Sequence, residues 1–106
     1  MRIDEMAFVG LNGRVLGVDR ETGRLVWEWR SPKPRSGFVS VMLDGDRLLV
    51  GISGYLYCLE AETGAQLWAN PLTGYGLGIL SFASVRGRTQ SNDAAQIRAE
   101  LDARSD

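Results

Sequence analysis

Histidine is absent from this sequence, and cysteine occurs once, as Cys58. Without histidine the chain lacks the commonest general base and metal ligand at neutral pH. A single cysteine excludes an internal disulfide bond and a zinc site built from cysteine and histidine. Because Cys58 lies within an apolar strand pattern, residues 55–59, we interpret it as a small buried hydrophobic residue and not as a reactive thiol. We therefore expect no metal site and no catalytic residue.

Long apolar runs and clusters of one charge are also missing. The apolar runs, such as residues 48–52, are far too short to cross a bilayer, and the N-terminus has no apolar segment of signal-peptide length. The net charge is −1, with acids and bases mixed along the chain, which does not fit a nucleic-acid-binding surface. We expect neither a membrane nor a nucleic acid as partner. If Met1 is the native start we expect a cytoplasmic protein, and if the start has been trimmed a periplasmic one.

The sequence contains an internal repeat of 19 residues. Residues 9–27 read VGLNGRVLGVDRETGRLVW and residues 50–68 read VGISGYLYCLEAETGAQLW, so that residue 9 corresponds to residue 50, an offset of 41 without a gap. The shared residues are mainly glycines, a Thr-Gly turn and a tryptophan, and a fixed period near 40 residues is typical of repeat architectures. The identical pairs are Val9/Val50, Gly10/Gly51, Gly13/Gly54, Glu21/Glu62, Thr22/Thr63, Gly23/Gly64 and Trp27/Trp68.

Short apolar segments separated by glycine turns predict an all-β fold. Asn12-Gly13 between two apolar segments is a strong signal for a tight hairpin, because both residues tolerate positive φ. Pro32 and Pro34 mark a connection, since proline cannot donate to a sheet. The segment 38–43 is almost continuously apolar, which suggests burial on both faces. The expected strands are residues 6–12, 14–19, 24–30, 38–43, 47–52, 55–61, 65–69 and 78–85.

Named by their place in a four-stranded unit, these strands run B, C, D, then A, B, C, D, then A. We therefore expect two repeat units within residues 1–88, the first lacking strand A and the second followed by a spare strand A. Residues 89–106 differ from the repeats. Asp93 and Gln96 loosely fit a capping box, which predicts a short C-terminal helix.

The repeated phrase resembles the pyrroloquinoline-quinone-like β-propeller repeats of quinoprotein dehydrogenases and of outer-membrane assembly lipoproteins of the BamB type. In that family a strand such as LYALDA is followed by TG, an apolar pair and Trp, and the phrase stands here at residues 56–68 and again at 15–27. The resemblance implies propeller blades of four antiparallel strands, about two per chain, with each tryptophan packed between neighbouring blades. We assign structural roles to the repeated residues Gly13, Thr22, Gly23, Trp27, Gly54, Thr63, Gly64 and Trp68.

The dehydrogenase branch of the family would add a quinone and a calcium ion, but the sequence departs from that branch. The dehydrogenases place an adjacent cysteine pair beside the quinone and need a full ring of blades, whereas this chain has one cysteine and two repeats. The acidic pairs Asp19/Glu21 and Glu60/Glu62 recur with the repeat, so we interpret them, together with Asp44/Asp46, as turn and solubility residues and not as a catalytic pair. We expect no cofactor and no enzymatic activity.

In a propeller with strand A innermost, the B–C turns and D–A loops share one face. In this chain that face carries three basic residues, Arg14, Lys33 and Arg35. An ordinary solvated loop face is the simplest interpretation, and a binding site for an anionic ligand or acidic peptide is the alternative. Trp29 and Tyr75 have no aromatic equivalent in the other repeat, which makes them the aromatic candidates for a special role. The residues of this possible binding face are Asn12, Arg14, Lys33, Arg35, Ser53, Tyr55 and Tyr75.

Two blades leave two apolar faces open, and repeat arrays generally need at least three units. A spare strand A that completes the first blade of another copy makes a head-to-tail contact, which closes a ring or grows a fibre. We expect a non-enzymatic module for protein interaction or scaffolding, completed by homo-oligomerisation. A cyclic tetramer is favoured because the resemblance implies eight blades as a common size, and a trimer comes second. The alternative is a fragment or relic of a larger quinoprotein dehydrogenase or propeller sensor.

Overall fold

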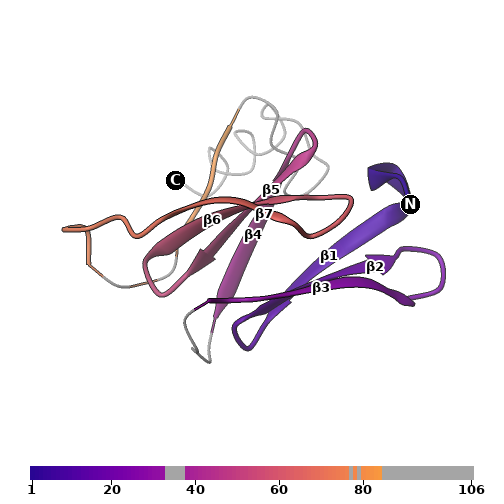
Figure 1. Cartoon of the computed structure of the whole chain (residues 1–106), viewed down its shortest axis with the longest axis horizontal. Coiled ribbons are helices and arrows are strands. Elements are labelled where there is room, and N and C mark those ends of the chain that lie inside the picture. Colours follow the sequence, from indigo (N-terminus) through magenta and orange to yellow (C-terminus); the bar gives the residue numbers. More distant parts are fainter. Residues whose placement is uncertain (33–37, 77, 79, 85–106) are drawn as a thin grey trace, which may run out of the picture.

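Glycine turns divide the chain into short strands that pair with their neighbours in sequence order. The computed structural model of the protein describes residues 1–32, 38–76, 78 and 80–84. It contains two antiparallel sheets, one of three strands and one of four (Figure 1). The predicted all-β fold class is confirmed. After a short 3-10 helix, η1 (Ile3–Glu5), the strands are β1 (Met6–Leu11), β2 (Arg14–Asp19), β3 (Leu25–Arg30), β4 (Val39–Asp44), β5 (Arg47–Ile52), β6 (Tyr55–Glu60) and β7 (Gln66–Asn70).

The hairpin turns between β1 and β2 and between β5 and β6 have the same backbone shape. Asn12 and Gly13 have φ of 50° and 74°, and Ser53 and Gly54 have φ of 48° and 85°. Positive φ at both central residues defines the tight turn whose twist matches that of the paired strands. Both repeats therefore begin from the same hairpin, although serine replaces asparagine in the second.

The turns between β2 and β3 and between β6 and β7 also match in detail. Gly23 and Gly64 have φ of 77° and 79°, a left-handed conformation that glycine adopts without strain. The hydroxyls of Thr22 and Thr63 each accept a hydrogen bond from the amide two residues later, at 3.2 Å in both repeats. The Thr-Gly pair recurs in the sequence because it builds this turn.

The two sheets pack against each other, and the core lies between them (Figure 1). Alternate side chains of β1 to β6 point into this layer, as expected for a sheet with one covered face, whereas the residues of β7 are exposed. β1 and β4, the first strands of the two sheets, contact each other. The buried residues of the core are Met6, Val15, Trp27, Trp29, Val39, Leu48, Val50, Ile52, Tyr57, Leu59 and Ala61.

β4 is less buried than its apolar sequence suggested. Val39 and Met42 are buried, but the other residues of the strand are partly exposed, and Phe38 precedes it with its side chain in solvent. Because side chains alternate along a strand, Val39 and Met42 point to opposite faces of β4, so the predicted burial on both faces is confirmed in part, by one buried residue on each. Within the part of the chain that the structure describes, β4 pairs with β5 alone and its other edge is unpaired.

The spare strand predicted at residues 78–85 is not formed within the described residues 78 and 80–84. Strand A pairs with the strand B that follows it, as β4 pairs with β5, and no such strand follows residue 84 in the described part of the chain. The segment nevertheless lies where the repeat would place it. A Cβ added to Gly51 would come within 2.7 Å of Leu80 Cβ, and one added to Gly10 would come within 2.8 Å of Val39 Cγ1.

The predicted boundary between the blades and the helical tail lies outside the residues that the structure describes. Residues 89–106 lie outside the described residues, so the C-terminal helix and the boundary at residue 88 stay predictions. Within the residues that are described, no helix is both long enough and apolar enough to cross a bilayer.

Candidate interface between blades

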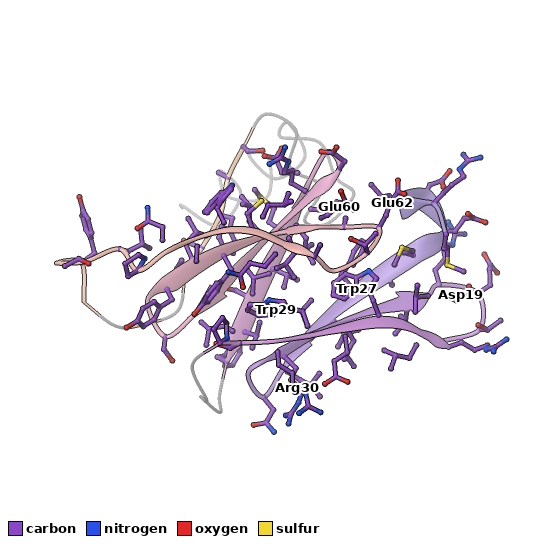
Figure 2. The ribbon with its side chains drawn as sticks, in the orientation of Figure 1. Asp19, Trp27, Trp29, Arg30, Glu60 and Glu62 are labelled. Atoms are coloured by element: carbon purple, nitrogen blue, oxygen red, sulfur yellow. The ribbon has the colours of Figure 1, made fainter. Side chains whose placement is uncertain are left out.

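Trp27 joins the two sheets through one hydrogen bond and one close ring contact. Its side chain leaves β3 and lies between the sheets (Figure 2). The indole Nε1 donates to the backbone carbonyl of Ala61 at 2.9 Å, within the core. The ring covers Gly64 so closely that a Cβ there would overlap its atoms. The turn between β6 and β7 is thus a seat for the tryptophan of the neighbouring blade.

Trp29 makes a second contact of this kind. Its Nε1 donates to Gln66 Oε1 at 3.1 Å, and its ring lies 5.0 Å from that of Tyr57 between centroids. The side chain is buried, so Trp29 packs between the blades and is not an exposed recognition aromatic. The repeat offered no sign of this pairing, because Asn70 stands at the position of Trp29 in the second repeat and Leu25 at the position of Gln66 in the first.

Trp68 stands at the position of Trp27 in the second repeat, but it has no blade beyond it among the described residues. Trp27 is 9% exposed, whereas Trp68 is 42% exposed. At the other end of the molecule, Gly23 corresponds to the seat glycine Gly64. Nothing lies within 4 Å of a Cβ built on Gly23. Within the described residues, Trp68 therefore has no glycine turn to pack on, and the equivalent glycine turn at Gly23 has no tryptophan packed on it.

The apolar residues of the first sheet that point away from the core continue this asymmetry. Val9 is 42% exposed and Leu11 47%, while their equivalents Val50 and Ile52 are exposed by 0% and 1%. The difference arises because the first sheet covers the second, whereas no blade covers Val9 and Leu11 among the described residues. We call this open surface the front face; its members are Ala7, Val9, Leu11, Leu16 and Val18.

The outer surface of the second sheet is partly covered by the segment after β7. Leu80 lies on Gly51, and the Ser84 hydroxyl donates to Asp44 Oδ1 at 2.9 Å. Cys58 is buried outside the inter-sheet core. Burial raises the pKa of the Cys58 thiol, although a hydrogen bond to Arg47 opposes the shift. We call this surface the rear face; its members are Gly51, Cys58 and Trp68, partly covered by Leu80 and Ser84.

The possible binding face of polar loops is placed only in part. The turns carrying Asn12 and Ser53 lie toward the same end of the molecule, away from the Thr-Gly turns (Figure 1), and Tyr75 is largely in solvent. The Tyr55 ring stacks on Tyr57. Lys33 and Arg35 lie outside the described residues, so their contribution to this face stays a prediction.

The basic character of this end is reduced by an acidic neighbour. Arg14 Nε lies 3.5 Å from Glu28 Oε2, and Arg30 Nε lies 2.8 Å from the same oxygen. Arg14 also donates to the carbonyl of Asn12 at 3.2 Å. The guanidinium of Arg14 is therefore already engaged by this chain, which weakens the case for an anion site here.

The acidic residues near the turns support those turns. Asp19 Oδ1 accepts a hydrogen bond from the Glu21 amide at 2.8 Å, and Glu60 Oε1 accepts one from the Thr63 hydroxyl at 2.8 Å. Asp19, Glu60 and Glu62 lie at the ends of the sheets and not between them (Figure 2). These contacts are the ones that turn residues make.

A quinone with its calcium ion does not fit the residues that the structure describes. Among them, no three His, Cys, Asp or Glu side chains are grouped to hold a metal ion. The single cysteine, Cys58, is buried in β6. Its thiol therefore does not face an open site.

Comparison with known proteins gives the same family as the repeated phrase. A family model described as "Outer membrane protein assembly factor BamB" matches residues 11–105. The chain is 26% identical over 94 residues to the "1-butanol dehydrogenase (quinone)" of Thauera butanivorans and, to the same extent, to the "Quinoprotein ethanol dehydrogenase" of Pseudomonas putida. Each match covers 74% of this chain and 15% of the relative, so the chain spans a small part of these relatives. The resemblance to pyrroloquinoline-quinone-like repeat proteins is confirmed.

Proposed function

The chain belongs to the family described as outer membrane protein assembly factor BamB, and on that premise we propose that it is a non-enzymatic β-propeller module for protein interaction or scaffolding, completed by copies of itself. Each copy contributes two blades. The front face of one copy covers the rear face of the next, in the way that the second sheet covers the first within the chain. The finished ring presents its loops to a protein partner.

One observation carries this proposal. The front-face residue Val9 is 42% exposed, while Val50, at the same place in the second repeat, is 0% exposed. Burial of a valine or leucine side chain stabilises by about 1.5–3 kcal/mol, and the front face holds several such residues. An apolar surface of this kind on a soluble protein marks an interaction site.

The two faces favour a head-to-tail ring. Because front and rear faces differ, the contact is between unlike surfaces, and such contacts either close into rings or continue as fibres. Propellers typically have four to eight blades, so about two to four copies of a two-blade chain close one. We propose the tetramer first and the trimer second.

The segment 80–84 supplies the missing strand in this arrangement. It lies over β5 through Leu80, as β4 lies over β1 through Val39. In the assembly it pairs with β1 of the next copy, taking the place that β4 takes beside β5. Each first sheet then gains a fourth strand, and the open edge of β1 is closed.

The non-enzymatic part of the proposal rests on what the repeated residues do. The shared threonines and glycines form turns, and Trp27 packs on the next blade. The dehydrogenase relatives favour a second candidate, in which the chain is a piece or relic of a larger quinoprotein or propeller sensor. In that case the covering blades come from the same polypeptide and not from copies.

A charge on the front face tests the proposal. Val9→Lys should reduce the mass of the assembly, measured by light scattering on a sizing column, to that of one chain, because lysine cannot be buried there without a partner. Val9→Ile, which keeps the surface apolar, should leave the assembly intact. Deleting residues 78–106 should also dissociate it. An unchanged mass for both Val9→Lys and the deletion would reject completion by copies.

The enzymatic alternative has its own test. The protein is mixed with pyrroloquinoline quinone and calcium ions and offered 1-butanol or ethanol with an electron-accepting dye. We expect no dye reduction above the rate measured without protein. Stoichiometric quinone binding accompanied by turnover would overturn the scaffold proposal, whatever the mass of the assembly.

A further inference from the structure

Within the chain, the contact between blades has a defined anchor. The indole of Trp27 sits on Gly64, and its Nε1 reaches the carbonyl of Ala61 at 2.9 Å. Both partners belong to the turn between β6 and β7. The contact combines an apolar ring with one buried, satisfied hydrogen bond, which fixes the position of the ring on the turn.

The first repeat carries the same seat at the turn between β2 and β3. By the repeat offset, Gly23 corresponds to Gly64 and Arg20 to Ala61. The hydrogen bond that closes the turn is 2.8 Å from the Asp19 amide to the Arg24 carbonyl, and the equivalent bond in the second repeat is 2.7 Å. The Gly23 amide likewise bonds to the Asp19 carbonyl at 2.7 Å, against 2.8 Å for its counterpart. The turn at Gly23 therefore has the same hydrogen bonds as the turn at Gly64, although no tryptophan packs on it in the single chain.

The matching ring is Trp68. In β3, Trp27 lies opposite Gly17, and in β7 Trp68 lies opposite Cys58. The space over Gly17 holds the Trp27 indole so closely that a Cβ there would come within 2.5 Å of it. Cys58 has a Cβ and a sulfur where Gly17 has none, so the surface of the sheet beside Trp68 differs from the one on which Trp27 lies. Trp68 is 42% exposed, which leaves its ring available to a neighbouring blade.

We propose that Trp68 of one copy docks on the turn formed by residues 20–24 of a second copy, with its ring over Gly23 and its Nε1 donating to the Arg20 carbonyl. The proposal rests on the proposed function, since it names the contact that joins the copies. A second copy is the occupant because ring and seat lie at opposite ends of one chain and have the geometry of a contact already present inside it. Repeating that contact is what a head-to-tail assembly requires.

Tryptophan fluorescence follows this contact directly. Trp27 and Trp29 are buried in every copy, and Trp68 is the one exposed tryptophan. As the protein is concentrated from dilute solution, the emission should shift to shorter wavelength and acrylamide quenching should fall. Both changes should vanish in Trp68→Phe while its sedimentation still shows assembly, because phenylalanine keeps apolar packing. A dissociation constant raised about 2–10-fold in that variant matches the loss of one hydrogen bond.

The seat is tested separately with asparagine, a residue that tolerates the left-handed conformation. Gly23→Asn fills the seat and should weaken assembly by about tenfold or more. Gly74→Asn is the matched control, because Gly74 also has positive φ and open space around it but does not belong to the turn. This variant should assemble with less than a twofold change.

The outcomes separate this inference from the proposed function. If the chain stays monomeric at all concentrations, both fail. If it assembles while Trp68 remains fully quenchable, or if Gly23→Asn and Gly74→Asn behave alike, the copies join by another contact and this inference alone is overturned.

Discussion

Val9 and Val50 occupy equivalent positions of the repeat, yet Val9 is 42% exposed and Val50 is completely buried. Trp68 and Trp27 differ in the same way. At the scale of the residue, a position in the repeat does not decide burial; the presence of a neighbouring blade does. The sequence repeat predicted the equivalence of these residues, and it gave no information about which member of each pair is covered.

Replacing Trp27 with alanine should strongly destabilise the chain. The substitution removes a buried aromatic ring and its hydrogen bond to Ala61, and such truncations cost about 3–5 kcal/mol. Trp68→Ala, made at the exposed equivalent, is the control. In dilute protein, chemical denaturation should show a much smaller loss for Trp68→Ala. Equal losses for the two variants would contradict the packing described for Trp27.

The Cys58 thiol should be protected in the folded protein. Because burial raises its pKa, the folded state favours the protonated thiol to higher pH than the unfolded chain does. Stability should therefore fall as the pH rises above the ordinary thiol value of about 8.5. A thiol reagent should label Cys58 slowly in native protein at pH 8 and fast in denaturant. Immediate stoichiometric labelling of the native protein would show that the thiol is accessible.

At the scale of the element, the sequence predicted the strands well wherever both partners of a pair lie in the chain. Asn12-Gly13 and Thr22-Gly23 gave the turns, and the strands between them follow within one or two residues. Residues 78 and 80–84 form no strand within the single chain, because an apolar segment forms a strand only when an adjacent strand satisfies its backbone, so the spare strand stays a prediction. The sequence overestimated the burial of β4 for a related reason, since apolar composition does not reveal an edge strand.

Gly64→Ala should destabilise the chain more than Gly23→Ala when both are measured in dilute protein. Both residues have positive φ, so alanine is strained at either position. At Gly64 the added Cβ would also overlap Trp27, whereas at Gly23 it meets open space. Overpacking adds about 1–3 kcal/mol. If thermal unfolding gave the same loss for both variants, Gly64 would not be the seat of Trp27.

At the scale of the whole molecule, the candidate interface was the part least predictable from sequence. The repeat and the spare apolar segment pointed to assembly, but neither showed which surfaces remain open. Only the packing of the two sheets shows that Gly23 has no tryptophan on it and that Trp68 is exposed, whereas their equivalents Gly64 and Trp27 contact each other. The Trp29–Gln66 contact could not have been predicted from the repeat, because neither residue recurs at the offset of 41.

We propose that one chain is a fraction of a propeller and that copies of the chain supply the rest. Native mass spectrometry tests this most directly, because it counts the chains in each assembly. With a chain mass of 11.6 kDa, we predict a dominant species of four chains, with three as the second closure. A dominant single chain at micromolar concentration would contradict completion of the propeller by copies.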